Sequence, residues 1–220
     1  MPHRLVPQSV IKRLPIYLRV LDRLVQRDID VISSKDLSDE TGFTAEQIRK
    51  DLAYFGAFGT RGTGYHTEFL RDKILKIIGL DRKTKVIVVG AGHLGFAFTR
   101  YTITKNPYVN VVAAFDSDPS VVGSKILDLE VLPVSDMEQV IEKEEVKVAI
   151  MSVPAEQAQE VANKLINAGI KAILNFAPVR LDYPEDVYIH NVDLTNELQS
   201  LIYYSTTEQE KIGRLSEEQE

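Results

Sequence analysis

The sequence predicts an α/β chain in which a small helical domain precedes a doubly wound domain built on a parallel sheet. Two short helices with capping signals lie before residue 60, β-branched apolar runs alternate with helical segments after residue 80, and an amphipathic segment follows the last run. We therefore expect domains at residues 1–80 and 81–192, followed by a C-terminal helix and tail at residues 193–220.

Composition limits the possible functions. The chain has 220 residues and is 44% hydrophobic, enough to bury the cores of two small domains. It has no apolar run of about 18 residues and no signal-peptide pattern, so we expect a soluble cytoplasmic protein with no membrane partner. With no cysteine and only four dispersed histidines, the chain offers no thiolate nucleophile and no metal-ligand spacing, and we expect no metal site.

Charge is divided unevenly along the chain. The net charge of −6 separates into +3 for residues 1–80 and −9 for the remaining 140 residues. Such asymmetry indicates that the first part meets a polyanion and the second does not. A net charge of +3 is also common in domains that bind no anion.

The first helix is expected within the segment IYLRVLDRLV. Leu18, Leu21 and Val25 recur there at helical spacing, and Pro15 is expected in the first turn, where its missing N–H costs nothing.

Two short capped helices follow. Ser33 precedes Asp36 by three residues and Thr44 precedes Gln47 by three, and both pairs match the capping-box pattern. Gly42 lies between the two helices as the turn. Two short helices joined by a tight turn predict a helix-turn-helix.

The second of these helices is expected from Ala45 to Phe55, ending at Gly56. Ile48, Leu52 and Phe55 share the side that must face the protein. The polar residues on the outer face and its flanks, which can reach base edges and phosphates, are Gln47, Arg49, Lys50 and Tyr54. An ordinary solvated helix surface carries the same residue types.

A β-hairpin is expected in AFGTRGTGY, from Ala57 to Tyr65, because three glycines surround Arg61 there. A helix-turn-helix followed by a hairpin with a cationic tip is a winged helix, whose wing can place an arginine in a narrow minor groove. The alternative is a plain connecting hairpin with an exposed arginine.

The second domain begins a series of apolar strands. The expected strands are Lys85–Val89, Asn110–Asp116, Lys147–Val153 and Lys171–Phe176. An alanine-rich amphipathic helix, stopped by Gly169, separates the last two. Strands without alternation that are separated by helices predict a parallel sheet buried on both faces.

The stretch GAGHLG follows the first of these strands and opens a helix, as the G-x-G-x-x-G dinucleotide fingerprint requires. Gly90 permits the tight turn, Gly92 lets the backbone approach a pyrophosphate, and Gly95 lets the helix pack closely on the strand. The helix N-terminus supplies amides and a positive dipole end. This combination predicts a Rossmann domain.

Asp116 ends the next strand, 21 residues after Gly95, where an acidic residue accepts hydrogen bonds from the adenosine ribose. No Arg or Lys follows at once in DSDPS, so a 2′-phosphate would meet Asp116 and Asp118 with no cation beside them. The sequence therefore favours NAD(H) over NADP(H).

No general acid or base is evident for hydride transfer. The segments expected at the ends of the later strands offer Ser152, Asn175 and Arg180, with no His or Lys in an obvious catalytic place. A nucleotide without a site to use it suggests a sensed ligand, and we expect no enzyme. Two alternatives stay open: a small NAD-dependent oxidoreductase whose N-terminal domain mediates association, and a nucleotide-gated module that acts on a protein.

The last segment, Asn191–Ser205, predicts an amphipathic helix followed by a polar tail to Glu220. Its apolar stripe consists of Leu194, Leu198, Leu201 and Ile202. The stripe packs either on its own chain or on a partner. We favour a partner, because a two-fold DNA reader needs a dimer.

Six stretches of the chain occur in an order typical of one protein family. They are IRKDLAYFGAFGTRGTGY, GAGHLG, AAFDSDP, MSVP, ILNFAPV and HNVDLT. Over almost its whole length the chain resembles the redox-sensing transcriptional repressors of the Rex family. The resemblance implies a homodimer with N-terminal winged helices and C-terminal Rossmann domains, in which the C-terminal helix is exchanged between subunits. It also implies operator binding when NADH is scarce and release when NADH binds, with NAD⁺ as a weaker competitor.

The resemblance also implies site residues. Those matching the family's DNA contacts are Gln47, Arg49, Lys50, Tyr54 and Arg61. Those matching its nucleotide contacts are Gly90, Ala91, Gly92, His93, Leu94, Gly95, Asp116, Ser152, Val153, Pro154, Asn175, Phe176, Ala177 and Pro178. A switch that couples the domains corresponds to Arg19, Tyr101 and Asp193. Some members carry Phe directly after that Asp, at the partner's nicotinamide pocket, whereas this chain has Leu194, which leaves an aromatic contact there open.

Overall fold

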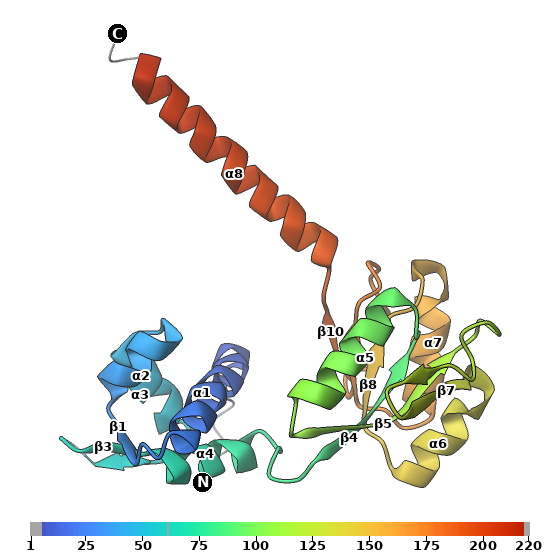
Figure 1. The fold of residues 1–220 in the computed structure, drawn as a ribbon, viewed down its shortest axis with the longest axis horizontal. Helices are drawn as coiled ribbons and strands as arrows, with labels where there is room; N and C mark the ends of the chain where they lie inside the picture. The colour runs from blue at the N-terminus through green and yellow to red at the C-terminus, as the bar shows by residue number, and fades with distance from the viewer. Residues whose placement is uncertain (1–5, 61, 218–220) are drawn as a thin grey trace. The chain divides into compact units, whose positions relative to one another are not determined.

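The computed structural model describes residues 6–60 and 62–217, with residue 60 and residues 207–217 described by their backbone alone. The chain forms two compact units, the first ending at Thr84 and the second beginning at Lys85. In Figure 1 the first unit is coloured blue to teal and the second green to red. Each unit has its own buried core.

The first unit is a winged helix-turn-helix. Its elements are α1 (Gln8–Gln26), β1 (Val31–Ile32), α2 (Ser34–Thr41), α3 (Ala45–Ala53), β2 (Gly59–Thr60), β3 (Gly64–His66) and α4 (Thr67–Ile77). The strands form an antiparallel sheet in the order β1-β3-β2. This arrangement confirms the predicted helix-turn-helix with a following hairpin.

Helix α1 begins earlier than the sequence predicted. Val10 and Leu14 continue the buried stripe of Leu18 and Leu21 toward the N-terminus, so the helix starts at Gln8 with Pro7 as its N-cap. The expectation that Pro15 lies in the first turn is therefore wrong. Pro15 lies inside the helix on its exposed side, where the carbonyl group that loses its N–H partner can be hydrated.

The turn between α2 and α3 has the expected chemistry. Ser33 and Asp36 form a complete capping box, and Gly42 ends α2 in the left-handed conformation at φ 76°. Thr44 accepts a hydrogen bond from the backbone nitrogen of Gln47 at 3.1 Å, but the side chain of Gln47 does not complete a box. Helix α3 ends at Ala53, two residues before the predicted end.

The hairpin and α4 complete the first unit. Strands β2 and β3 pair Gly59 with Tyr65, which confirms the predicted hairpin. Helix α4 was not predicted. Its buried residues Leu70 and Ile74 belong to the core, and α4 packs against α1. Arg61, the predicted tip residue, lies outside the described residues.

The second unit is a doubly wound Rossmann domain followed by a long helix. Its elements are β4 (Thr84–Val89), α5 (His93–Lys105), β5 (Val109–Asp116), β6 (Lys125–Ile126), β7 (Leu129–Pro133), the 3-10 turn η1 (Val134–Asp136), α6 (Met137–Glu144), β8 (Val148–Met151), α7 (Ala155–Asn167), β9 (Ala172–Asn175), β10 (Tyr188–Asn191) and α8 (Leu194–Glu217). The strands form one sheet in the order β10-β9-β8-β4-β5-β7-β6, with β6 antiparallel to β7. The four predicted strands and the alanine-rich helix are confirmed to within two residues.

Both faces of this sheet are covered, as Figure 1 shows for α5 and α7. Along β4, Ile87 and Val89 belong to a core that includes buried residues of α6 and α7, whereas Val86 and Val88 belong to a second core against which Phe98 of α5 packs. From β4 the chain first adds strands β5, β6 and β7 on one side of β4, and then adds β8, β9 and β10 on the other side. The direction in which strands are added therefore reverses at β4, and ligands of open α/β sheets bind at such a point.

Helix α8 is longer than predicted, because the residues expected as a polar tail continue the helix to Glu217. The side chains of the predicted stripe are all more than half exposed within this chain: Leu194, Leu198, Leu201 and Ile202. None of the described helices combines the length and the apolar character needed to cross a lipid bilayer.

Candidate nucleotide and nucleic-acid sites

The glycine-rich loop after β4 is shaped by close packing. Gly90 has φ 92°, a conformation that favours glycine, and a Cβ there would collide with the carbonyl oxygen of Ser152. A Cβ at Gly95 would collide with the carbonyl oxygen of Gly90. The protein itself therefore requires glycine at both positions, as the fingerprint predicted.

Gly92 is different. A Cβ at Gly92 would meet no protein atom within 4 Å, so packing within this chain gives no reason for glycine there. Gly92 is the N-cap of α5, and no side chain caps the first turn of that helix. A pyrophosphate lying against the exposed backbone and the helix N-terminus accounts for both features, and the loop therefore fits a dinucleotide.

Asp116 ends β5 beside this loop. Its Oδ2 accepts a hydrogen bond from the backbone nitrogen of Ala91 at 2.7 Å, and its Oδ1 accepts one from the backbone nitrogen of Asp118 at 2.9 Å. The carboxylate is half-buried and lines the adjacent cavity. Asp116 thus holds the loop and also faces the space where a ribose would lie.

A cavity of about 530 Å³ lies between the glycine loop, the end of β5 and the start of α7. The predicted cofactor residues that line it are Gly90, Gly92, Asp116, Ser152, Val153 and Pro154. Sequence reasoning missed Gln157, Glu160 and Lys164 of α7, which line the same cavity. Lys164 Nζ pairs with Glu160 Oε1 at 2.7 Å. Lys164 therefore brings a cation to the cavity near Asp116, which the DSDPS stretch did not indicate.

The other predicted cofactor residues are placed differently. Ala91 and His93 line a neighbouring depression, and Ala177 and Pro178 line a cavity of about 300 Å³ that also contains Asp193. Phe176 packs edge-on against Phe98 of α5. The remaining predicted residues line none of these cavities in the described part of the chain: Leu94, Gly95, Asn175 and Phe176.

Asn175 is buried and held by its surroundings. Its Nδ2 donates to the carbonyl oxygen of Ala177 at 3.0 Å and to Oδ1 of Asn191 at 2.9 Å, and its Oδ1 accepts from the backbone nitrogen of Ala177 at 2.9 Å. The side chain shapes the turn after β9. A direct contact with the nicotinamide stays a prediction.

In the first unit, α3 and the hairpin line a groove of about 620 Å³. Arg49 lies in this groove and donates through Nη1 to Oγ of Ser34 at 2.8 Å. Lys50 pairs with Glu46 at 2.8 Å, and both side chains are about two-thirds exposed. Tyr54 is 37% exposed. Cationic and polar groups are therefore presented where a winged helix meets DNA.

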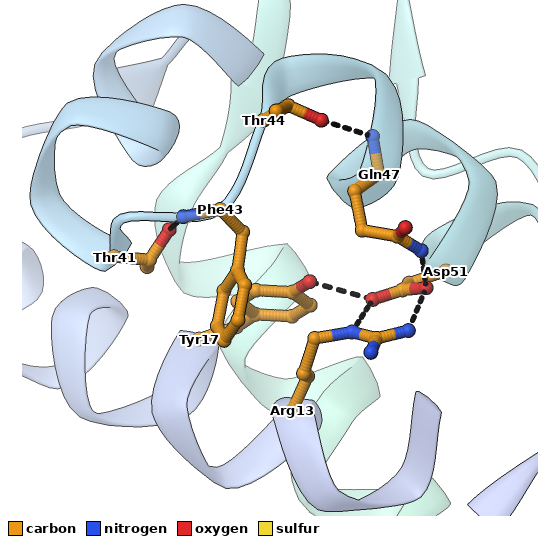
Figure 2. A network of polar contacts seen from close by, with 7 residues as sticks. All are labelled: Arg13, Tyr17, Thr41, Phe43, Thr44, Gln47 and Asp51. Atoms are coloured by element: carbon orange, nitrogen blue, oxygen red, sulfur yellow. Dashed lines mark hydrogen bonds and ion pairs between the residues drawn. The ribbon is translucent and has the colours of Figure 1, made fainter. Parts of the chain in front are cut away.

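A buried polar network anchors α3 to α1 (Figure 2). Asp51 is fully buried, and its carboxylate accepts hydrogen bonds from Arg13 Nε at 2.6 Å, Arg13 Nη2 at 2.8 Å, Tyr17 Oη at 2.6 Å and Gln47 Nε2 at 2.8 Å. Burial raises the pKa of Asp51, but the hydrogen bonds from Arg13, Tyr17 and Gln47 outweigh burial, and the net pKa is lowered. Sequence reasoning missed this network entirely.

The three predicted switch residues are divided between the units. Arg19 is exposed on α1, Tyr101 is 63% exposed on α5, and Oδ1 of Asp193 accepts hydrogen bonds from the backbone nitrogens of Thr195 and Asn196, both at 3.0 Å. Asp193 thus caps α8. The coupling itself stays a prediction.

Among the described residues, no cluster of three or more His, Cys, Asp or Glu side chains is arranged to hold a metal ion.

Two family models match the chain. One, described as the N-terminus of a putative DNA-binding protein, matches residues 5–53, and one described as a CoA binding domain matches residues 81–179. These ranges fall in the winged helix and in the Rossmann domain.

Relatives with curated names match over most of the chain. A redox-sensing transcriptional repressor Rex from Natranaerobius thermophilus is 61% identical and covers 92% of this chain and 92% of its own length. A Rex from Carboxydothermus hydrogenoformans is 44% identical, covering 90% of this chain and 95% of its own.

Solved structures agree. A crystal structure of RSP in complex with β-NAD⁺ and operator DNA has a TM-score of 0.86 at 41% identity, covering 96% of this chain and 97% of that one. RSP in complex with β-NADH has a TM-score of 0.81 at 40% identity, covering 96% and 99%. With this identity over nearly the full length and the same two-unit fold, the chain belongs to the Rex family of redox-sensing transcriptional repressors.

Proposed function

We propose that this chain is a transcriptional repressor that binds operator DNA as a homodimer when NADH is scarce and leaves it when NADH binds. One observation carries the proposal: the same chain contains a winged helix with cationic side chains on α3 and a glycine loop that fits a dinucleotide. In that loop, packing within the chain does not require glycine at position 92, whereas a bound pyrophosphate would. The similarity to RSP, solved with operator DNA and with β-NADH, supports both halves of the proposal.

NADH is the effector in this proposal and NAD⁺ the weaker competitor. The carboxylate of Asp116 beside the cavity supports a nucleotide with a free ribose 2′-hydroxyl over one with a 2′-phosphate. Lys164 is the one cation that lines the cavity among the described residues, and its pairing with Glu160 offsets its charge.

The proposed mechanism is an equilibrium between two forms of the dimer, one that binds the operator and one that NADH prefers. Each ligand then weakens binding of the other by the same factor, because linkage is reciprocal. The proposed DNA contacts are Gln47, Arg49, Lys50, Tyr54 and Arg61, and the proposed coupling residues are Arg19, Tyr101 and Asp193. The exposed stripe of α8 is proposed to pack on the second subunit.

Fluorescence anisotropy tests the function. A labelled palindromic duplex, selected from a random pool with the full-length protein, is titrated with protein and then with NADH, NAD⁺, NADPH and coenzyme A at fixed salt. Coenzyme A is included because residues 81–179 match a family described as a CoA binding domain. We expect release by NADH at far lower concentration than by the other three. If none of the four compounds changes DNA binding, the proposed NADH sensing is wrong and only the proposed DNA binding stands.

The competing functions predict other results. A small oxidoreductase would consume NADH with one of a panel of carbonyl compounds, whereas we expect no turnover. A module that acts on a protein would show little salt dependence with DNA, whereas neutralising several phosphates gives a slope of about one log unit of affinity per log unit of salt for each contact.

A further inference from the structure

The amide of Gln47 has only one chemically sensible orientation. Its side-chain nitrogen lies 2.8 Å from Oδ1 of Asp51, a carboxylate that also receives Arg13 and Tyr17. An ionised carboxylate only accepts hydrogen bonds, so turning the amide over would set oxygen against oxygen. The nitrogen of Gln47 therefore faces Asp51, and the oxygen is directed elsewhere.

Both ends of Gln47 are held. Its backbone nitrogen donates to Oγ1 of Thr44 at 3.1 Å, and its side-chain nitrogen donates to Asp51 (Figure 2). It is the third residue of α3, close to the helix N-terminus, and it is half-buried. Residues near the N-terminus of a recognition helix contact base edges.

The anchor behind Gln47 is buried and closely packed. Tyr17 is fully buried and packs edge-on against Phe43 with ring centroids 5.9 Å apart, and the Arg13 guanidinium lies 5.8 Å from the same ring centroid. Arg13 also binds Asp51 through two nitrogens, a bidentate geometry that fixes both partners. Asp51 therefore presents a fixed acceptor to Gln47.

We propose that Asp51 is a positioning residue of the DNA-reading surface, which orients the amide of Gln47 so that its oxygen and its second N–H read one adenine in each operator half-site. A carboxamide pairs with adenine by accepting from N6 and donating to N7. Asp51 accepts one N–H of the Gln47 amide, which leaves the second N–H and the amide oxygen for this pairing. The inference rests on the proposed function and adds a residue that acts through Gln47 and does not touch DNA.

The first experiment maps base preference with the full-length protein. Using the palindromic duplex selected with the wild-type protein, each base pair is substituted symmetrically in both half-sites, and affinity is measured by fluorescence anisotropy. We expect one position per half-site where replacing adenine–thymine costs about tenfold to a hundredfold in affinity. Gln47→Ala and Asp51→Ala, which removes both carboxylate oxygens, should each abolish the preference at that position and retain the others.

Tyr17→Phe is the matched control. It removes one hydrogen bond to Asp51 and leaves those from Arg13 and Gln47, so it should lower stability and keep the preference map. Loss of the adenine preference in Tyr17→Phe as in Asp51→Ala would show that the preference follows stability, and would overturn the proposal. Retention of the preference in Asp51→Ala or in Gln47→Ala would overturn it as well.

A second measurement needs no folded Asp51 variant. In ¹⁵N-labelled wild-type protein, the side-chain NH₂ of Gln47 is assigned by its absence from Gln47→Ala. We expect its exchange with water to be slower than that of the exposed Gln139 on α6, because one N–H of Gln47 is bound to a buried carboxylate. Equal exchange rates would overturn the orientation. If the wild-type protein enriches no duplex from the pool, the proposed function fails, a result distinct from a map that lacks a Gln47-dependent position.

Discussion

Asp116 Oδ2 accepts a hydrogen bond from the backbone nitrogen of Ala91 at 2.7 Å, which ties the end of β5 to the glycine loop after β4. The same carboxylate lines the cavity proposed for the nucleotide. One side chain therefore fixes the loop that would receive the pyrophosphate and faces the space that would receive the ribose. Its substitution should affect nucleotide affinity and nucleotide choice together.

We expect Asp116→Asn to narrow the preference for NADH over NADPH. The amide oxygen can still accept from Ala91, so the loop stays tied, although the amide nitrogen cannot accept from the backbone nitrogen of Asp118 as Oδ1 does. The negative charge that opposes a 2′-phosphate is gone. Affinity for NADH should fall about tenfold, the loss of one good hydrogen bond to a charged group, and affinity for NADPH should fall less. Titration followed by NAD(P)H fluorescence gives both constants, and an unchanged ratio would contradict the role of the charge.

Gly92→Ala and Gly95→Ala form a matched pair. A methyl group at Gly92 meets no protein atom within 4 Å, so this variant should unfold at nearly the wild-type temperature and yet bind NADH at least tenfold more weakly, because the methyl group occupies the path of the pyrophosphate. A methyl group at Gly95 collides with backbone, so that variant should lose about 1–3 kcal/mol of stability. Thermal unfolding and NADH titration separate the two. Wild-type affinity in Gly92→Ala would place the pyrophosphate elsewhere.

The parallel strands and the glycine loop could be predicted because their signals are local. Val86 to Val89 form one uninterrupted apolar run that ends in glycines, and both the buried strand and the turn leave that mark in adjacent residues. Helix α4 carries a weaker local signal, which sequence reasoning missed: Leu70, Ile74 and Ile77 recur at helical spacing, but the helix follows β3 directly and its N-cap, His66, makes no side-chain capping bond. Its packing on α1 identifies the stripe as part of the core.

Asp51 could not be recognised from sequence for a related reason. Its partners Arg13 and Tyr17 are 38 and 34 residues away, and an acidic residue on a helix is ordinarily read as solvated surface. Lys164 is similar, because α7 brings it to the Asp116 cavity from 48 positions farther along the chain. Contacts that depend on tertiary packing leave no spacing pattern in the sequence.

Asp51 should make the free energy of unfolding depend on pH in the acidic range. Because its pKa is held below the ordinary value of 3.8, the carboxylate stabilises the fold above that value, and the stabilisation is lost as pH falls through the folded-state pKa. Asp51→Asn should lose on the order of 3 kcal/mol at about pH 7, since Arg13 loses its charged partner. Urea unfolding from about pH 7 down to about pH 3 measures the difference, which should shrink toward the acid end. A difference that is constant across this range would contradict the assignment.

Asp193 should couple NADH binding to DNA release. Asp193→Ala should still bind NADH but respond less to it on operator DNA, and it also loses an α8 cap worth about 1 kcal/mol. Asp193→Asn is the control, because an asparagine oxygen caps a helix without charge. If Asn responds to NADH like the wild type, Asp193 acts only as a cap. If Asn fails like Ala in an operator gel shift, the charge carries the coupling.

Lys50 and Glu46 form an exposed pair on α3, and DNA must compete with Glu46 for the Lys50 ammonium group. Lys50→Ala should weaken operator binding about tenfold to a hundredfold if Lys50 reads a base edge, with little effect on random DNA. An equal loss of affinity for both DNAs, together with a slope of log affinity against log salt that is smaller by about one, would make Lys50 a phosphate contact. Glu46→Gln releases Lys50 and removes a negative charge, so it should tighten binding. Anisotropy with operator and random duplexes at two salt concentrations decides among these outcomes, and wild-type affinity in both variants would remove this pair from the interface.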